Sequence, residues 1–472
     1  MEEEKLGYSS EEEAEALQAV QKFERMKKNN ERCFFDVIEF ELIIDYYIES
    51  NNAAKAFEAA DLACEQHPNS TSIQLRKAKA LLDKGRAVEA LSLLKKLENI
   101  EADNCELYIL KGTAYCILGD VQGAIKMFEK ALVAEPDETE YILFSITSVL
   151  QIQNYYKQMI PYMLKLIEIE PDFKAHIYDL AFAYDKIDDY ENSIKYYLEY
   201  LEDDPFSDSA WYNLGITYNK LDMFDKAMEA YDFALAINSQ NTFALFNKAN
   251  ILNHIEEYGE AIQVYHEYLE IEPDSFEAMT YMAECYERAG DFTMAKKYYH
   301  EALDLAPDYA DPWFGLGILA LDSDKTEESI LYFRKAVMLD DENPEYWYLL
   351  GQAHIKNEEP KIALRCFREA LKLNAYCNEI WADLGKIIFN ENIVKKAIPY
   401  LEKAYKVTGD VPGINYLLAS LYLHLKINDK AYRHLATAVN MEKDVFQEFT
   451  ELFPANKMTR KMKKLFVADS QN

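Results

Sequence analysis

The stretch that decides the fold is residues 208–241, which read DSAWYNLGITYNKLDMFDKAMEAYDFALAINSQN. In its first half, bulky residues from Trp211 to Tyr218 recur every three or four positions, which places them on one face of an α-helix. Small and aromatic residues from Ala227 to Ala234 recur with the same spacing in the second half. The stretch therefore predicts two antiparallel helices, with small residues where their backbones approach closely.

The same kinds of residue recur every 34 positions along the chain. One column of small residues falls in the second half of the unit, at Ala56, Ala90, Ala124, Ala227, Ala261, Ala295, Ala363, Ala397 and Ala431. Another falls twelve positions earlier, at Ala78, Gly112, Ala181, Gly215, Ala249, Ala283, Gly317, Gly351, Gly385 and Ala419. A period of this length indicates a repeat protein in which each unit packs against its neighbours.

The quoted stretch also follows a known consensus, Trp-x2-Leu-Gly-x2-Tyr…Ala-x3-Phe…Ala. The matching residues are Trp211, Leu214, Gly215, Tyr218, Ala227, Tyr231 and Ala234. The chain therefore resembles a tandem tetratricopeptide repeat array. The resemblance implies an all-α fold, a right-handed α-α superhelix (solenoid) of helical hairpins with terminal capping helices. With positions numbered 1 to 34, twelve units begin at residues 37, 71, 105, 140, 174, 208, 242, 276, 310, 344, 378 and 412.

This register predicts three parts of the chain. They are an N-terminal acidic segment with a capping helix at 1–36, twelve repeats at 37–445, and a C-terminal capping helix with a basic tail at 446–472. Asp side chains are good helix N-caps, because they accept hydrogen bonds from the first backbone N–H groups. Asp120, Asp189 and Asp291 are the expected caps of second helices, and Asp311 and Asn343, each followed by proline, are the expected caps of first helices.

Charge narrows the choice of partner. The 472 residues include 50 Lys and Arg and 83 Asp and Glu, for a net charge of −33. This balance argues against nucleic acid and anionic membranes, and it favours a basic protein or peptide partner. The chain opens with acidic residues after Met1 and has no long uncharged apolar stretch, so we expect a cytoplasmic protein without membrane insertion. The seven cysteines are scattered, and we expect reduced thiols.

No sequence motif for chemistry is present. Phosphate-binding glycine loops and the Gly-x-Ser-x-Gly nucleophile motif are missing, and the eight histidines include no His-Glu-x-x-His pattern. We therefore expect no catalytic residue, no metal site and no cofactor.

The resemblance implies that first-helix residues line a concave groove in which peptides of partner proteins lie. Position 5 is aromatic in seven repeats, including Tyr416 in the last, and polar residues occupy positions 6 and 9 in the middle of the array. The candidate partner-binding residues are Phe144, Tyr178, Asp179, Tyr212, Asn213, Phe246, Asn247, Asn250, Phe314 and Tyr348. Two interpretations remain open. Either the rings stack on a bound peptide whose backbone pairs with the asparagines, or the rings pack sideways on the neighbouring first helix.

A chaperone-type carboxylate clamp is not expected. That clamp uses lysine at positions 5 and 9, yet Lys79 and Lys386 at position 9 accompany Leu75 and Ala382 at position 5.

Five cations gather near the end of the chain, at Lys457, Arg460, Lys461, Lys463 and Lys464. They fit a solvated helix with cations near its C-terminus. They also fit a contact with an acidic surface, such as the Glu-rich N-terminus of a second copy, which leaves self-association open.

The sequence thus predicts a non-enzymatic scaffold or adaptor that binds peptide segments of partner proteins in the groove. The alternative is a regulatory receptor for a short signalling peptide. A receptor would need an output element, and residues 1–36 show no convincing DNA-binding helix-turn-helix.

Overall fold

The computed structural model describes residues 10–31, 33–171, 173–454 and 457–466. Over these ranges the chain forms α-helices and two 3-10 helices and contains no β-strand, which confirms the predicted all-α superhelical repeat fold. The backbone contacts divide it into two compact units, Met1–Ser239 and Gln240–Asn472, which we call unit 1 and unit 2.

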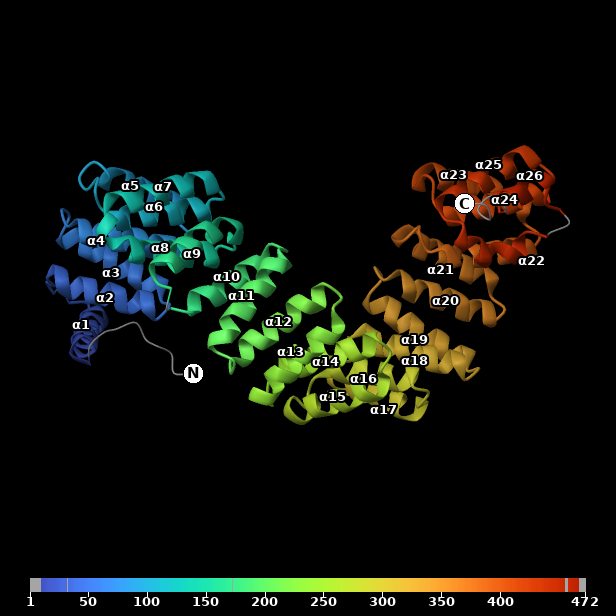
Figure 1. Cartoon of the computed structure of the whole chain (residues 1–472), viewed down its shortest axis with the longest axis horizontal. Coiled ribbons are helices and arrows are strands. Elements are labelled where there is room, and N and C mark those ends of the chain that lie inside the picture. The colour runs from blue at the N-terminus through green and yellow to red at the C-terminus, as the bar shows by residue number, and fades with distance from the viewer. Residues whose placement is uncertain (1–9, 32, 172, 455–456, 467–472) are drawn as a thin grey trace. The chain divides into compact units, whose positions relative to one another are not determined.

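Unit 1 consists of one helix followed by six helix pairs, which succeed one another in chain order (Figure 1). The described helices are α1 (Ser10–Asn29), α2 (Val37–Glu49), α3 (Ala53–Gln66), α4 (Thr71–Asp83), α5 (Ala87–Leu97), α6 (Cys105–Ile117), α7 (Val121–Ala134), the 3-10 helix η1 (Pro136–Glu138), α8 (Thr139–Ile152), α9 (Tyr156–Ile169), α10 (Ala175–Lys186), α11 (Tyr190–Asp203), α12 (Asp208–Lys220) and α13 (Phe224–Ile237).

Unit 2 consists of six further pairs and a C-terminal segment. Its described helices are α14 (Thr242–His254), α15 (Tyr258–Ile271), α16 (Phe276–Arg288), α17 (Phe292–Leu305), α18 (Ala310–Asp322), α19 (Thr326–Leu339), α20 (Pro344–Lys356), α21 (Pro360–Leu373), α22 (Asn378–Asn390), α23 (Val394–Thr408), α24 (Pro412–His424), α25 (Asn428–Met441), the 3-10 helix η2 (Asp444–Leu452) and α26 (Arg460–Lys464). From α2 to α25, the even-numbered member of each pair is the first helix of a repeat. The division of the chain at residues 36/37 and 445/446 stays a prediction.

The small residues of the repeat lie where a first helix meets the aromatic ring of its second helix. A Cβ atom added at Gly215 would lie 2.5 Å from the Tyr231 ring, and one added at Gly351 would lie 2.4 Å from the Phe367 ring. Such distances are far inside van der Waals contact, so a larger side chain would push the two helices apart. The predicted close approach of the paired helices is therefore present.

The turn between the two helices of a repeat has one conformation throughout. Position 15 has a positive φ angle in all twelve repeats, at Asn51, Gly85, Gly119, Asn154, Asp188, Asp222, Glu256, Gly290, Asp324, Glu358, Asn392 and Lys426. A left-handed residue at this point ends the first helix and lets the chain reverse. Only three of these positions hold glycine, the residue best suited to them.

Four of the five expected caps are correct. The Asn343 side chain accepts a hydrogen bond from the backbone N–H of Glu345 at the start of α20. The side chains of Asp120, Asp189 and Asp291 accept hydrogen bonds from backbone N–H groups in α7, α11 and α17. The expectation for Asp311 is wrong, because α18 already begins at Ala310 and its N-cap is Tyr309. Pro312 is tolerated inside this first turn, where the backbone N–H groups have no partner within the helix.

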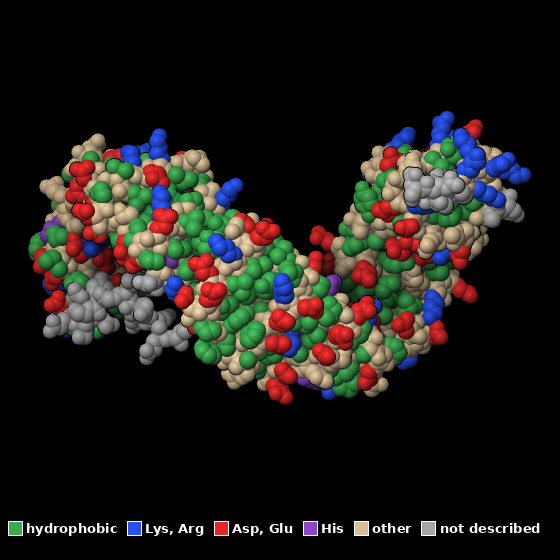
Figure 2. Space-filling model, in the orientation of Figure 1, with side chains coloured by type: hydrophobic (Ala, Val, Ile, Leu, Met, Phe, Trp, Pro, Cys, Tyr) green, Lys and Arg blue, Asp and Glu red, His purple; other side chains and the backbone are tan. Residues whose placement is uncertain are grey.

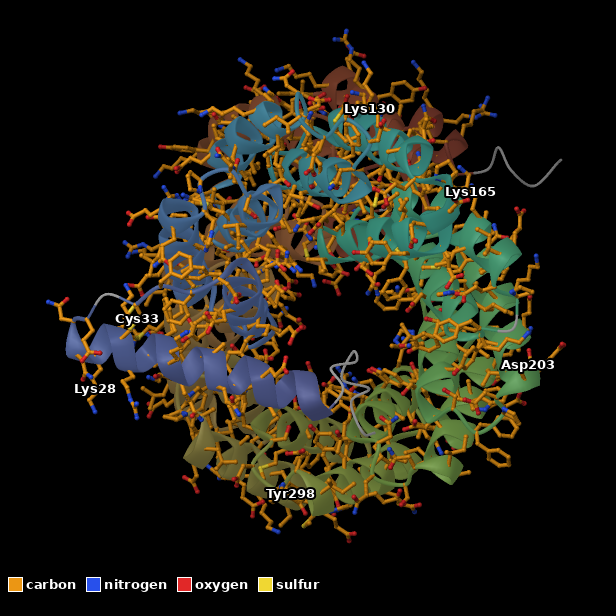
Figure 3. The ribbon with its side chains drawn as sticks, turned by 90° about the vertical axis from the view of Figure 1, so that its left-hand side faces the viewer. Lys28, Cys33, Lys130, Lys165, Asp203 and Tyr298 are labelled. Atoms are coloured by element: carbon orange, nitrogen blue, oxygen red, sulfur yellow. The ribbon has the colours of Figure 1, made fainter. Side chains whose placement is uncertain are left out.

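Second helices form the outer layer of unit 1. Figure 3 labels Lys130, Lys165 and Asp203, which come from α7, α9 and α11, along the outer edge of the unit. The same helices bury large rings, among them Phe128 and Tyr197, neither of which is exposed at all. Each second helix is thus amphipathic, with its apolar face toward the first helices.

Candidate functional site

The position-5 rings lie against rings of the second helix in the same repeat. The ring centroids are 5.7 Å apart for Tyr178 and Tyr197, 6.0 Å for Tyr212 and Tyr231, 6.2 Å for Phe246 and Tyr265, 5.6 Å for Phe314 and Phe333, and 5.7 Å for Tyr348 and Phe367. All five partners occupy position 24 of their repeats. These separations are those of interacting aromatic pairs, so the rings form part of the packing between the helices.

The same rings also touch the next first helix along the chain. In unit 1, the Asn213 amide donates a hydrogen bond of 2.7 Å to the Tyr178 hydroxyl. In unit 2, the Phe314 ring lies 4.7 Å from the Tyr346 ring. The rings are half-buried, and burial raises the pKa of the Tyr178 hydroxyl. Sideways packing on the neighbouring first helix therefore occurs, together with the contact to position 24.

The ten predicted residues divide equally between the two units. Phe144, Tyr178, Asp179, Tyr212 and Asn213 lie in unit 1, and Phe246, Asn247, Asn250, Phe314 and Tyr348 lie in unit 2. They therefore form two separate sets, and each set is a candidate site by itself.

Phe144 and Asp179 differ from the other members of the unit 1 set. Phe144, on α8, is the most exposed position-5 ring of that set, with 47% of its surface accessible. Asp179, on α10, is half-buried, and this burial raises the pKa of its carboxyl although His176 lowers it. One site thus combines an accessible apolar ring with a partly desolvated carboxylate.

The asparagines of unit 2 lie beside a hollow. Asn247 is half-buried on α14, and Asn250, one turn further on, accepts a hydrogen bond of 2.5 Å from the Tyr265 hydroxyl. Asn250 also lines a hollow of about 530 Å³ between α14 and α16. We call this space the α14/α16 hollow.

Tyr281, Glu284 and Arg288 form the α16 side of the α14/α16 hollow. Glu284 is half-buried, which raises the pKa of its carboxyl, although Arg288 lowers it. Within the described ranges, neither the Glu284 nor the Arg288 side chain has a hydrogen bond or an ion pair. Sequence reasoning missed both residues, although they occupy positions 9 and 13, which face away from the core.

A second hollow of about 550 Å³ lies on α18, α20 and α22 in unit 2. Four of its polar residues, Gln352, Lys356, Asp383 and Lys386, already form hydrogen bonds. The Asp383 carboxylate accepts hydrogen bonds from the Tyr348 hydroxyl at 3.1 Å, from the Gln352 amide at 2.7 Å and from Lys386 at 3.1 Å. Lys356 donates a hydrogen bond to the carbonyl of Leu321. A ligand there would meet a satisfied network, unlike in the α14/α16 hollow.

Chemical features are few in the described part of the chain. It holds no group of three or more His, Cys, Asp and Glu that could bind a metal ion, and none of its helices is long and apolar enough to cross a membrane. The seven cysteines are free thiols. Burial raises the pKa of Cys116 to about 11, which keeps this thiol protonated and a poor nucleophile at neutral pH.

Models of the tetratricopeptide repeat family match several stretches of the chain. The matched residues are 106–138, 177–206, 209–241, 244–275, 287–353 and 344–376. A comparison with curated protein sequences finds no match.

Similar solved structures have low sequence identity to the chain. They include the Cut9–Hcn1 hetero-tetramer of the APC/C, at 12% identity, with 94% of each chain covered and a TM-score of 0.40. The type IV pilus biogenesis factor PilW has 19% identity and a TM-score of 0.40, and the match covers 45% of this chain and 99% of PilW. YrrB, described as a TPR protein with an unusual peptide-binding site, has 17% identity and a TM-score of 0.32, covering 38% of this chain and 92% of YrrB.

Proposed function

This chain belongs to the tetratricopeptide repeat family, whose repeats serve as protein-interaction scaffolds, and we propose that its first helices hold peptide segments of partner proteins. In this proposal the chain carries out no reaction. The observation that carries it is the α14/α16 hollow, because the exposed positions of two neighbouring first helices line it and two of its charged side chains have no partner within the described residues.

In each unit, the rings at position 5 form the floor of that unit's own binding face. Tyr178 in unit 1 and Phe246 in unit 2 are held by rings of their own second helices. Rigid, half-buried rings offer apolar contact at little cost in side-chain entropy.

Polar side chains above this floor make the directional contacts. The oxygen of the Asn250 side chain accepts the hydrogen bond from Tyr265, which leaves the two amide hydrogens of Asn250 to donate to a peptide carbonyl. Donation to the backbone of a ligand does not depend on its side chains, so this contact supports binding of many sequences.

The preferred partner segment is basic. Glu284 carries a half-buried carboxylate that lacks an ion-pair partner within the described chain, and a lysine or arginine of the ligand would supply one. The net charge of −33 would in addition attract cationic segments over a distance and speed their association.

The test is a double substitution on the binding face, E284A/R288A. The full-length chain is immobilised and used to recover partners from lysate of its native cell, which are then identified by mass spectrometry. We expect the double variant to lose the partners that the wild type retains, because the two charged side chains that α16 contributes to the hollow are removed.

The matched control is K297A/E301A on α17, the second helix of the same repeat. It also removes one cation and one anion, and this pair already forms an ion pair at 3.6 Å on an exposed surface. The control should recover partners as the wild type does. Equal recovery by E284A/R288A, with far-UV circular dichroism unchanged, would exclude the α14/α16 hollow as the binding site.

A further inference from the structure

The C-terminal segment of unit 2, described at residues 444–454 and 457–466, is held in place by apolar contacts. Met462 of α26 is only 1% exposed, and the Phe466 ring lies 4.3 Å from the Phe446 ring. The Thr459 side chain caps the N-terminus of α26 by accepting a hydrogen bond from the backbone of Met462. The short basic helix therefore has a defined position on the end of unit 2.

The cations of this segment lie at the surface. Lys457, Arg460, Lys461, Lys463 and Lys464, which we call the basic end, are all exposed. Among the described residues none of them pairs with a carboxylate, and Lys461 lies over the Tyr432 ring at 3.9 Å. Figure 2 shows Lys and Arg side chains gathered where α25 and α26 lie. This surface is therefore available to an anionic partner.

The rest of the chain has the opposite charge. From residue 378 onward it carries 14 Lys and Arg and 11 Asp and Glu, whereas the preceding residues carry 36 and 72. The densest acidic stretch near the N-terminus is 1–15, with seven glutamates and one lysine. Residues 1–9 of it lie outside the described residues. Charge complementarity therefore exists within one sequence, between its two ends.

A cavity next to the basic end selects among anionic partners. It has a volume of about 280 Å³, and its wall combines Lys386, Lys457 and the carboxylate of Glu451 with apolar side chains that include Phe389, Leu423 and Leu452. Lys386 already pairs with Glu451 at 3.9 Å, so the cavity itself accepts an apolar side chain, and Lys457 with the rest of the basic end attracts acidic residues on either side of it. Nucleic acid has no such side chain, and an enclosed cavity offers a bilayer no protruding apolar anchor.

We propose that the basic end binds the acidic N-terminal segment, residues 1–15, of a second copy of this chain. That segment carries Leu6 and Tyr8 between its two clusters of glutamate, so it supplies both the charge and an apolar side chain for the cavity. Contact between the tail of one copy and the head of another is heterologous, and it can therefore continue from copy to copy. The association does not depend on the partner-binding face proposed above.

Sedimentation velocity of the full-length chain in 50 mM and 500 mM NaCl tests this association. We expect species larger than the monomer at the low salt concentration and monomer at the high one, because salt screens exposed charges. The variant K457E/K463E/K464E should weaken self-association at least about tenfold, since it replaces attraction by repulsion. The control K395E/K396E/K403E makes the same change of charge on exposed lysines of α23 and should associate as the wild type does.

Mixing two variants separates direct contact from general electrostatics. E2K/E3K/E4K and K457E/K463E/K464E should each fail to self-associate, but together they should form a mixed dimer, because the intact basic end of the first variant can bind the intact acidic segment of the second. A wild type that stays monomeric in 50 mM NaCl would overturn the proposal. So would equal association of the K457E/K463E/K464E variant, or binding of the basic end to phosphatidylserine vesicles without self-association.

Discussion

Helices α20 and α24 hold the same place in their repeats, yet their position-5 tyrosines have different surroundings. Both helices belong to unit 2 and begin with proline. Tyr348 of α20 is half-buried, and its hydroxyl donates to Asp383 of the next first helix. Tyr416 of α24 is completely buried and stacks on Phe449 of η2, with 5.2 Å between the ring centroids.

The difference shows what makes a first-helix face available to a ligand. Position 9 repeats the contrast in exposure, because Gln352 of α20 is half-buried whereas Ser420 of α24 is 1% exposed. The C-terminal segment covers the last repeat and turns its binding positions into core. The same residue type at the same position is therefore a candidate contact in one repeat and a packing residue in another.

The largest expected effect comes from removing the two rings. Y416A should reduce the local opening free energy of α24 by about 3–5 kcal/mol, because a fully buried ring leaves a cavity. Y348A should cost roughly 1–2 kcal/mol around α20, since that ring is only partly buried. Hydrogen–deuterium exchange with mass spectrometry measures both values locally, which suits a repeat protein. Equal losses at the two sites would mean that η2 contributes little to the packing of α24.

A second prediction concerns Glu287 of α16, a half-buried carboxyl that has no counterpart on α20. Burial raises the pKa of Glu287 to about 7 from an ordinary 4.5, although the Tyr299 hydroxyl donates to it at 2.9 Å and lowers it. The folded chain therefore holds this proton to higher pH than the unfolded chain does. The stabilising contribution of the protonated form is complete below about pH 4.5 and is lost as the pH rises through about 7.

E287Q should consequently stabilise unit 2 at pH 8 by roughly 1–3 kcal/mol and change little at pH 4.5. Glutamine stays neutral and still accepts the hydrogen bond from Tyr299. Urea midpoints at the two pH values measure the difference. The control E301Q, on the exposed face of α17, should show no such pH dependence. A gain of equal size at both pH values would contradict a titrating Glu287.

The helix pairs could be predicted from the sequence because their signal recurs twelve times. The small residue at position 8 and the ring at position 24 form one contact, as Gly351 and Phe367 do, and this pair of residue types recurs in seven of the twelve repeats. The left-handed residue at position 15 could not be predicted. Its residue type varies, and Glu358 and Lys426 give no sign of a positive φ angle. The conformation comes from the packing of the two helices on either side of the turn.

The candidate site was predictable only in part. Helical periodicity indicates how a side chain points relative to its own axis, but not where the neighbouring helix lies. Tyr178 was expected either on a ligand or on the next first helix, and its additional contact with Tyr197 requires the antiparallel pairing in three dimensions. Glu284 and Arg288 resemble any other surface charges in the sequence, and only the approach of α14 makes them part of a hollow.

The smallest expected effect comes from removing the hydroxyl groups of Tyr348 and Tyr416 while keeping their rings. Y348F should change stability by less than about 0.5 kcal/mol, because Asp383 keeps its hydrogen bonds from Gln352 and Lys386. Y416F should cost about 1 kcal/mol, since the Tyr416 hydroxyl donates at 2.8 Å to the carbonyl of Glu442 and ties α24 to the end of α25. Hydrogen exchange of the amides at the end of α25 should be faster in Y416F and unchanged in Y348F. If Y348F destabilises the chain as much as Y416F does, the hydrogen bonds around Asp383 depend on the Tyr348 hydroxyl. The face of α20 that carries Tyr348 would then be held as rigidly as the covered face of α24.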